Sequence, residues 1–259
     1  FYNEGWAEIE GTAVFRTGQE GAYSYTYPIG AGDRKKVVEM LMEDAKEKGY
    51  PFQLHAVSKG EMEELESYFP GKFNVEWPRD LEDYVYETEK LINLSGKKYH
   101  GKKNHLNQFK AAYPDWKYET ITDENVEECF QMALSWRNHN GCEDDPEKNQ
   151  EMCVALNSLR LFKELHLKGG LLRVNGKVVA YTLGEPVSDD TFVVHIEKAY
   201  ADIRGAYTMI NQQFLEHEVK DYTYVNREED TGDEGLRTAK LSYRPVFMVE
   251  KGIVTLKGE

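Results

Sequence analysis

The sequence has little cysteine and no long apolar run. Its 259 residues include three cysteines, Cys129, Cys142 and Cys153, and none of them forms a CxxC pair. An odd number of thiols without paired spacing favours reduced cysteines and a cytoplasmic protein. No apolar stretch approaches the roughly 20 residues that cross a bilayer, and no secretory signal is recognisable at the Phe1 end. The sequence therefore gives no sign of a disulfide scaffold or of a membrane-spanning helix.

Positive charge is also scarce. There are 32 Lys and Arg residues against 46 Asp and Glu, for a formal net charge of −14. A chain this acidic is not expected to coat DNA or anionic lipid by charge alone, although a local basic patch can still bind an anion. Hydrophobic residues make up 40% of the chain, enough for one large domain or two small ones.

The N-terminal half begins with short strands. Gly11 separates two of them like a hairpin, and AYSYTY alternates as a third strand. Asp33 is the expected N-cap of a helix that ends near Lys48. The expected strands are 6–9, 12–16, 22–27, 52–57 and 73–77, and the expected helices are 33–48 and 61–69. The order is β-β-β-α-β-α-β.

The C-terminal half follows a basic segment, residues 96–110, and contains Asn175-Gly176, a strong hairpin signal. Its expected strands are 117–121, 171–174, 177–183, 191–199, 222–225 and 246–250, and its expected helices are 124–137, 147–167, 205–216 and 236–243. The last seven elements repeat the order of the first half. We therefore expect two units, residues 1–95 and 116–259, joined by a basic connector and helix over 96–115. A leading β-α-α of the first unit is expected before Phe1.

The helix expected over 236–243 carries a lysine among apolar residues. Lys240 shares a face with Leu236 and Tyr243, and Arg237 lies at the border of that face. An unpaired buried ammonium costs several kcal/mol, so we expect an anionic partner. That partner is either the acidic run 228–230 or a substrate phosphate, carboxylate or acyl oxyanion.

The element order of the second half resembles the GNAT acyltransferase fold. Two such units in tandem resemble the Fem-type peptidoglycan aminoacyltransferases and the C-terminal domain of phosphatidylglycerol lysyltransferase. GLRTAKLSYRPVF looks like the lysyltransferase signature, with Leu236, Arg237, Lys240, Tyr243 and Pro245 at its positions. KLINLSGKKYHGKKNHLNQFK and EKAYADIRGAYTMINQQF resemble a soluble branch of that family. The resemblance covers nearly the whole chain and implies an α/β (α+β) fold of two tandem GNAT-like units, each a mixed twisted sheet flanked by helices.

The resemblance also implies transfer of an acyl or aminoacyl group to an amine or hydroxyl of a small molecule or peptide. GNATs that bind acetyl-CoA place small residues after Arg/Gln-x-x-Gly at the start of their central helix, where backbone amides cradle pyrophosphate. Here Arg204 and Gly205 are followed by Tyr207 and Met209, which disfavours coenzyme A and favours aminoacyl-tRNA as donor. Two alternatives stay open: a CoA-dependent N-acetyltransferase, and a non-catalytic module that binds a phosphorylated or acidic ligand.

Four residues are expected to carry the chemistry. Glu197, on the strand before the central helix, would take a proton from the acceptor. Arg237 and Lys240 would stabilise the developing negative charge, and Tyr243 would protonate the leaving group. For Glu197 the alternative is an ion pair with Lys198 or a neighbouring strand.

Donor binding is expected from two places. The connector is basic without any acid, and its candidates are Lys97, Lys98, His100, Lys102, Lys103 and His105; the alternative is a solvated linker. Arg204, Gly205, Asn211 and Asn226 are expected at the central helix or facing it, with local capping as the alternative. No histidine pair has metal-ligand spacing, so we expect no metal site and no permanently bound cofactor.

Overall fold

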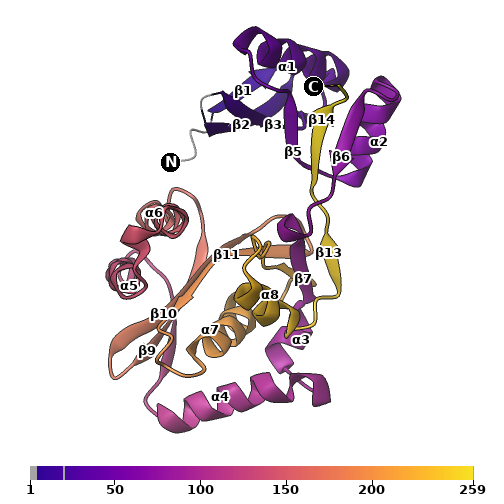
Figure 1. Cartoon of the computed structure of the whole chain (residues 1–259). Coiled ribbons are helices and arrows are strands. Elements are labelled where there is room, and N and C mark those ends of the chain that lie inside the picture. The colour runs from indigo at the N-terminus through magenta and orange to yellow at the C-terminus, as the bar shows by residue number, and fades with distance from the viewer. Residues whose placement is uncertain (1–4, 20, 259) are drawn as a thin grey trace. The chain divides into compact units, whose positions relative to one another are not determined.

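The computed structural model describes residues 5–19 and 21–258, which form two compact units with separate hydrophobic cores (Figure 1). The first unit contains the residues up to 82 together with 229–232 and those from 249 onward, and the second contains 83–228 and 233–248. The chain therefore divides differently from the expected boundary at residue 95. Residues 83–95 fold with the second unit because their strand pairs there, and the last strand of the chain returns to the first sheet.

The first unit is a mixed sheet with two helices. Its strands are β1 (Gly5–Ile9), β2 (Thr12–Gln19), β3 (Ala22–Thr26), β4 (Ile29–Gly30), β5 (Gln53–Val57), β6 (Phe73–Glu76) and β14 (Gly252–Leu256). Its helices are α1 (Arg34–Lys48) and α2 (Lys59–Tyr68). The sheet order is β1-β2-β3-β5-β14-β6, with β4 paired to β2. Asp33 caps α1 as expected, because its side chain accepts a hydrogen bond from the backbone N–H of Lys36 at 3.0 Å.

The second unit has a sheet of order β13-β7-β12-β11-β10-β9-β8. Its strands are β7 (Asp83–Glu87), β8 (Lys117–Thr120), β9 (Lys168–Val174), β10 (Lys177–Pro186), β11 (Thr191–Ala199), β12 (Tyr224–Asn226) and β13 (Phe247–Val249). Its helices are α3 (Thr88–Asn93), α4 (His100–Ala112), α5 (Val126–His139), α6 (Pro146–Arg160), α7 (Ala206–Phe214) and α8 (Glu234–Leu241). The expected hairpin joins β9 to β10, with positive φ at both Asn175 and Gly176.

Helices cover both faces of this second sheet. One core lies between the sheet and the pair α5 and α6, and it includes Cys129, Met152, Leu171, Tyr181 and Ile196. The other core lies on the opposite face beneath α4 and α7, and it includes Phe109, Leu172, Phe192, Val194, Met209 and Phe214. Figure 1 shows α5 and α6 together on one side of β10 and α7 on the other. The side chains of α7 and of the sheet face below it therefore define the surroundings of Glu197.

Candidate active site around Glu197

The strands β11 and β12 diverge within the second sheet. They pair in parallel at three positions, Thr191 with Tyr224, Phe192 with Val225 and Val193 with Asn226. β12 ends there, whereas β11 continues to Ala199. Among the described strands, none replaces β12 along this last part of β11. Glu197 therefore lies on a strand segment with an open edge, where backbone groups can bind a ligand.

A β-bulge turns the Glu197 side chain toward α7. In the pairing of β10 with β11, Leu183 faces Ile196 but the next residue, Gly184, faces Val194, so His195 is the extra residue. A bulge shifts the alternation of side chains by one. Before it, Val194 belongs to the core under α7; after it, Ile196 belongs to the core under α5 and α6. Glu197 consequently faces α7.

The Glu197 carboxylate is held from two elements. Arg227, the first residue after β12, donates from Nη2 to Oε1 at 3.0 Å, and Asn211 of α7 donates from Nδ2 to Oε2 at 3.0 Å. The side chains of Arg227 and Glu197 are 11% and 12% exposed, and Asn211 is 1% exposed. A buried charge pair of this kind is stable only with good geometry and further hydrogen bonds.

Two polar atoms of this arrangement have no hydrogen-bond partner in the part of the chain that the structure describes. Arg227 Nη1 and Asn211 Oδ1 are both buried, and neither has a hydrogen-bond partner among the described residues. Asn211 Nδ2 donates to Glu197, which fixes Oδ1 as the free acceptor. One unused donor and one unused acceptor therefore flank the same carboxylate. Buried polar groups are rarely left without a partner, so a pair of them calls for an explanation.

Aromatic rings pack against the guanidinium. Arg227 lies 4.9 Å from the ring centroid of Tyr243 and 5.9 Å from that of Tyr86. Burial alone would lower the pKa of Arg227, but Glu197 and the two tyrosines outweigh it and hold the pKa above its usual value. Burial raises the pKa of Tyr243 against the opposing effect of Arg227, and its hydroxyl donates to Thr208 at 3.4 Å. The ring of Tyr243 thus supports a guanidinium that stays charged.

Lys102 reaches the same ring from α4. It lies half-buried on the inner side of the helix with Leu106 and Phe109, at the spacing of one helical face. Its Nζ lies 3.8 Å from the ring centroid of Tyr243. Burial and the neighbouring charge of Arg227 lower the pKa of Lys102 to about 8, although Glu197 acts in the opposite direction. We call Glu197, Arg227, Asn211, Tyr243 and Lys102 the Glu197 cluster.

Lys240 is buried and binds the main chain that carries Arg227. It is 8% exposed, and its ammonium donates to the carbonyl oxygens of Arg227 at 2.6 Å and Glu228 at 3.2 Å. Lys240 therefore holds the backbone that carries Arg227. The face expected for this helix needs correction, because Leu236 is 40% exposed while Lys240 and Tyr243 are buried. A helix of eight residues packs on a narrow stripe, and here positions three apart face inward.

Several other candidate residues lie outside the cluster. Arg237 pairs with Glu234, one turn earlier on the same helix, at 3.0 Å. Asn226 donates to Asp83 at 3.0 Å and accepts from the backbone of Glu228 at 2.7 Å, so it is satisfied locally. Arg204 is exposed before α7. Of the expected catalytic residues, the structure brings together Glu197 and Tyr243, with Asn211 and Lys102 from the binding candidates.

The basic connector forms a short helical turn, Lys97–Tyr99, followed by α4. Its exposed members are Lys97, Lys98, His100 and Lys103, with His105 half-buried. Burial, aided by Lys102 and Arg204, lowers the pKa of His105. Gly205 packs directly beneath α4: its φ is +86°, and a Cβ there would lie 2.6 Å from the carbonyl oxygen of His105. The start of α7 is therefore covered by α4.

Arg227 is the central residue that the sequence analysis did not single out. It stands in NREEDTG, directly before an acidic run that draws attention away from a single arginine. Its position directly after a short strand could have indicated a functional residue, because strand ends carry functional side chains in sheets of this type.

His195 forms a second charged arrangement beside the cluster. Its ring nitrogens lie 2.7 Å from Glu228 and 3.1 Å from Glu185. The hydrogen bond to Glu228 raises the pKa of His195, despite the opposing effect of burial. His195 thus ties the segment after β12 to β10 through the bulged position.

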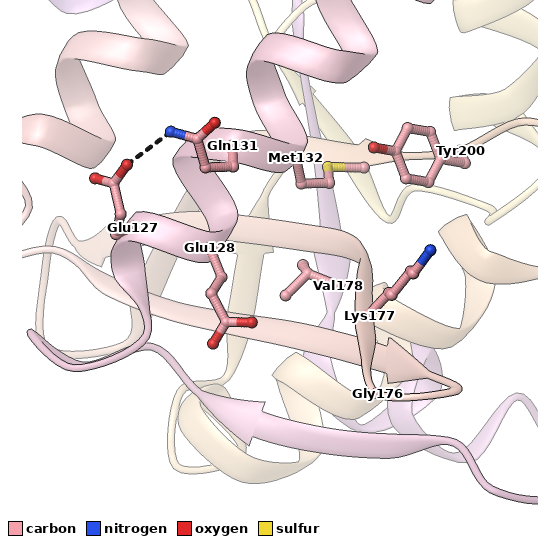
Figure 2. A pocket seen from close by; sticks show the side chains of 8 residues that line it. All are labelled: Glu127, Glu128, Gln131, Met132, Gly176, Lys177, Val178 and Tyr200. Atoms are coloured by element: carbon pink, nitrogen blue, oxygen red, sulfur yellow. Dashed lines mark hydrogen bonds between the residues drawn. The ribbon is translucent and has the colours of Figure 1, made fainter.

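A separate hollow lies between α5 and the β9–β10 hairpin (Figure 2). Its volume is about 350 Å³, and it is lined by Glu127, Glu128, Gln131, Met132, Gly176, Lys177, Val178 and Tyr200. Two of its acids are already engaged, Glu127 with Gln131 at 2.7 Å and Glu128 with Arg173 at 2.5 Å. None of the expected site residues lines it.

No group of three or more His, Cys, Asp or Glu side chains in residues 5–19 and 21–258 is arranged to hold a metal ion. Within the same residues, no helix combines the length and hydropathy needed to cross a membrane.

Comparison with known proteins identifies the family of the chain. The model of the family described as phosphatidylglycerol lysyltransferase, C-terminal, matches residues 3–254. The chain belongs to this family. A crystal structure of a conserved protein of unknown function from Bacteroides thetaiotaomicron is 40% identical, with a TM-score of 0.92 over 99% of this chain and 86% of that one. L-PGS from Bacillus licheniformis is 15% identical, with a TM-score of 0.68 over 98% and 84%.

Two further comparisons bear on the fold and on the length. A tandem GNAT protein from the clavulanic acid biosynthesis pathway is 8% identical, with a TM-score of 0.53 over 96% of this chain and 80% of that one, which confirms the GNAT-like α/β fold. An uncharacterised protein of Mycoplasmoides gallisepticum is 26% identical over 175 residues, which are 66% of this chain and 55% of that protein. The match thus spans about half of that relative. Family and fold together support an acyltransferase of general type.

Proposed function

We propose that this protein transfers an aminoacyl group from aminoacyl-tRNA to an amine or hydroxyl acceptor, and that the Glu197 cluster holds the reacting end of the donor. The observation that carries the proposal is the pair of buried atoms without protein partners, Arg227 Nη1 and Asn211 Oδ1, on either side of Glu197. A ligand that satisfies both must bring a hydrogen-bond acceptor and a donor on neighbouring groups.

An aminoacyl ester has that combination. Its carbonyl oxygen accepts from Arg227, and its α-ammonium donates to Asn211 Oδ1 beside the Glu197 carboxylate. An acetyl group has only the carbonyl, and it would leave the buried acceptor of Asn211 unsatisfied at a cost of about 1–3 kcal/mol. As the carbonyl is attacked, negative charge grows on its oxygen, and a guanidinium kept charged by Glu197 stabilises that charge.

The packing of α4 argues against coenzyme A as donor. In acetyl-CoA-binding GNATs the start of the central helix binds pyrophosphate through bare backbone amides. Here the equivalent position, Gly205, packs against the backbone of His105. Tyr207, which we expected to obstruct phosphate, is 38% exposed at the first turn of α7. Helix α4 occupies space that a pyrophosphate would need.

The exposed side of α4 suits an RNA donor instead. Lys97, Lys98 and Lys103 are exposed at its start, while Lys102 on the inner side reaches Tyr243. Phosphates of a tRNA acceptor end lying along the lysines would bring the esterified 3′ nucleotide toward Glu197. Such a donor occurs in the cytoplasm, in accord with the reduced cysteines expected from the sequence.

A transfer assay tests the proposal. Purified protein is incubated with tRNA charged with a radiolabelled amino acid, including lysine because the family description names a lysyl group, and with a panel of amines, hydroxyl compounds and phosphatidylglycerol vesicles. We expect loss of label from tRNA and its appearance in one acceptor class, with Asn211→Leu slowed and Asn157→Leu, a change on α6, as the matched control. Turnover with acetyl-CoA and none with any charged tRNA would overturn the aminoacyl assignment in favour of an N-acetyltransferase. Binding without turnover would favour a non-catalytic module.

A further inference from the structure

Aminoacyl transfer requires a general base that removes a proton from the acceptor, and both carboxylate oxygens of the expected base, Glu197, are already hydrogen-bonded. Glu197 was expected to act as this base. Both of its oxygens already accept hydrogen bonds, from Arg227 and from Asn211. Protonating it would break a buried ion pair, which costs several kcal/mol. Glu197 is therefore better suited to keep Arg227 charged and in place than to take up a proton.

The other polar groups around the ring of Tyr243 are also unsuited. Arg227 stays protonated under all ordinary conditions. The hydroxyls of Tyr243 and Tyr86 donate to Thr208 and to the carbonyl of Lys240, and burial raises the pKa of both phenols. The ammonium of Lys240 donates to two main-chain carbonyls, so its proton is held.

Lys102 differs from all of these. Its amine lies against the face of Tyr243 at 3.8 Å, and within the described chain no carboxylate forms an ion pair with it. Arg227 lies against the same ring at 4.9 Å, so a second positive charge stands close to the amine. Lysines placed in this way, desolvated and next to another cation, lose their proton readily and serve as bases.

We infer that Lys102 is the general base of the transfer, an inference that rests on the proposed function. The neutral amine of Lys102 takes the proton from the acceptor O–H or N–H as the acceptor atom bonds to the acyl carbon. The bond from that carbon to the ribose 3′ oxygen then breaks, and the lysine ammonium returns the proton to this leaving oxygen. The proton count balances, and no other reactant is needed.

The charges that face Lys102 come from three other elements. Arg227 after β12 disfavours its ammonium, Glu197 of β11 favours it, and Tyr243 after α8 contributes its ring. On α4 itself, the charge of Lys102 acts on His105 and lowers the pKa of that histidine. With a pKa of about 8, about one molecule in ten carries a neutral Lys102 at pH 7. The rate should therefore rise with pH up to about 8 and level off above it.

Two substitutions of Lys102 distinguish a general base from a residue that only contributes positive charge. Lys102→Arg keeps the charge but cannot release a proton, and Lys102→Met removes both. If Lys102 is the base, both variants lose about 10²–10⁴-fold in kcat, and both lose the rise toward pH 8. The control is Lys110→Met, an exposed lysine near the other end of the same helix, which should keep both the wild-type kcat and its rise with pH.

A second measurement does not depend on turnover. Trace labelling of lysines with acetic anhydride across pH, read by peptide mass spectrometry, should show Lys102 half-reactive near pH 8, well below the pH of about 10.4 at which an ordinary lysine is half-reactive. An active Lys102→Arg enzyme, or labelling of Lys102 that rises only near the ordinary lysine value, overturns the inference while leaving the proposed function intact. A wild-type protein that transfers from no donor refutes the proposed function, and the base role with it.

Discussion

Removing Arg227 should destabilise and inactivate the protein, because it breaks a buried ion pair with Glu197. Removing Glu197 as well should restore the stability but not the activity. The two side chains are 11% and 12% exposed and bonded at 3.0 Å. Arg227→Met leaves the Glu197 carboxylate buried with only Asn211 as partner, which should lower the free energy of unfolding by about 3–5 kcal/mol. The double variant Arg227→Met, Glu197→Leu carries no charge at either of these two positions and should recover most of that loss.

The comparison is made by urea unfolding followed by circular dichroism, beside the transfer assay. Arg173→Met serves as a matched control, because Arg173 is 15% exposed and pairs with Glu119 and Glu128 on another part of the sheet. It should lose stability but keep its activity per folded molecule. The double variant should stay inactive although stable. Losses that add within about 0.5 kcal/mol across the cycle, or an active double variant, would refute the reasoning.

Three further changes follow from the same structure. Gly205→Ala should lower the free energy of unfolding by about 1–3 kcal/mol, because it strains a positive φ and brings a Cβ to 2.6 Å from the backbone of α4; an unchanged urea midpoint would contradict the packing of α4 on α7. The folded protein raises the pKa of His195, so the ion pairs of His195 contribute their full stability below its unfolded pKa and are lost as the pH rises through its folded pKa. His195→Gln should therefore lower the free energy of unfolding more at about pH 5.5 than at about pH 9. An equal loss at both pH values would contradict the pairing. Lys240→Met should lower both the thermal midpoint and the activity, since the carbonyls of Arg227 and Glu228 lose their donor; activity lost at full stability would instead favour direct contact with substrate.

Local patterns predicted most of the elements. The Asp33 cap and the Asn175-Gly176 turn are short-range signals, and the structure confirms both. The hydrophobic periods located most of the helices, although the face expected for the helix over 236–243 was wrong. The strand β7, the helix α3 and the last strand β14 were missed. Each is short, and DYVYE and GIVTL acquire their place only from distant partners, β12 for the first and β5 with β6 for the second.

The candidate site was predictable only in part, and for a specific reason. Glu197 and Asn211 could be proposed from their places on a strand and on the helix after it. The bulge at His195, which decides the face that Glu197 occupies, depends on the pairing of β10 with β11 and leaves no mark in the local sequence. Arg227 became visible only when β12 brought the start of NREED beside β11. Lys240 was read correctly as buried, and two of the groups that its ammonium binds are main-chain carbonyls, which a sequence pattern does not display.

The most direct test of the account is calorimetric titration with a stable donor mimic, an aminoacyl amide of 3′-amino-adenosine, beside the same compound acetylated on its α-nitrogen. The account predicts that the free α-ammonium form binds about tenfold or more tightly, the equivalent of one buried hydrogen bond to a charged group, and that Asn211→Leu removes this preference. Equal affinity of the wild-type protein for the two compounds would contradict the role given to Asn211, Glu197 and Arg227.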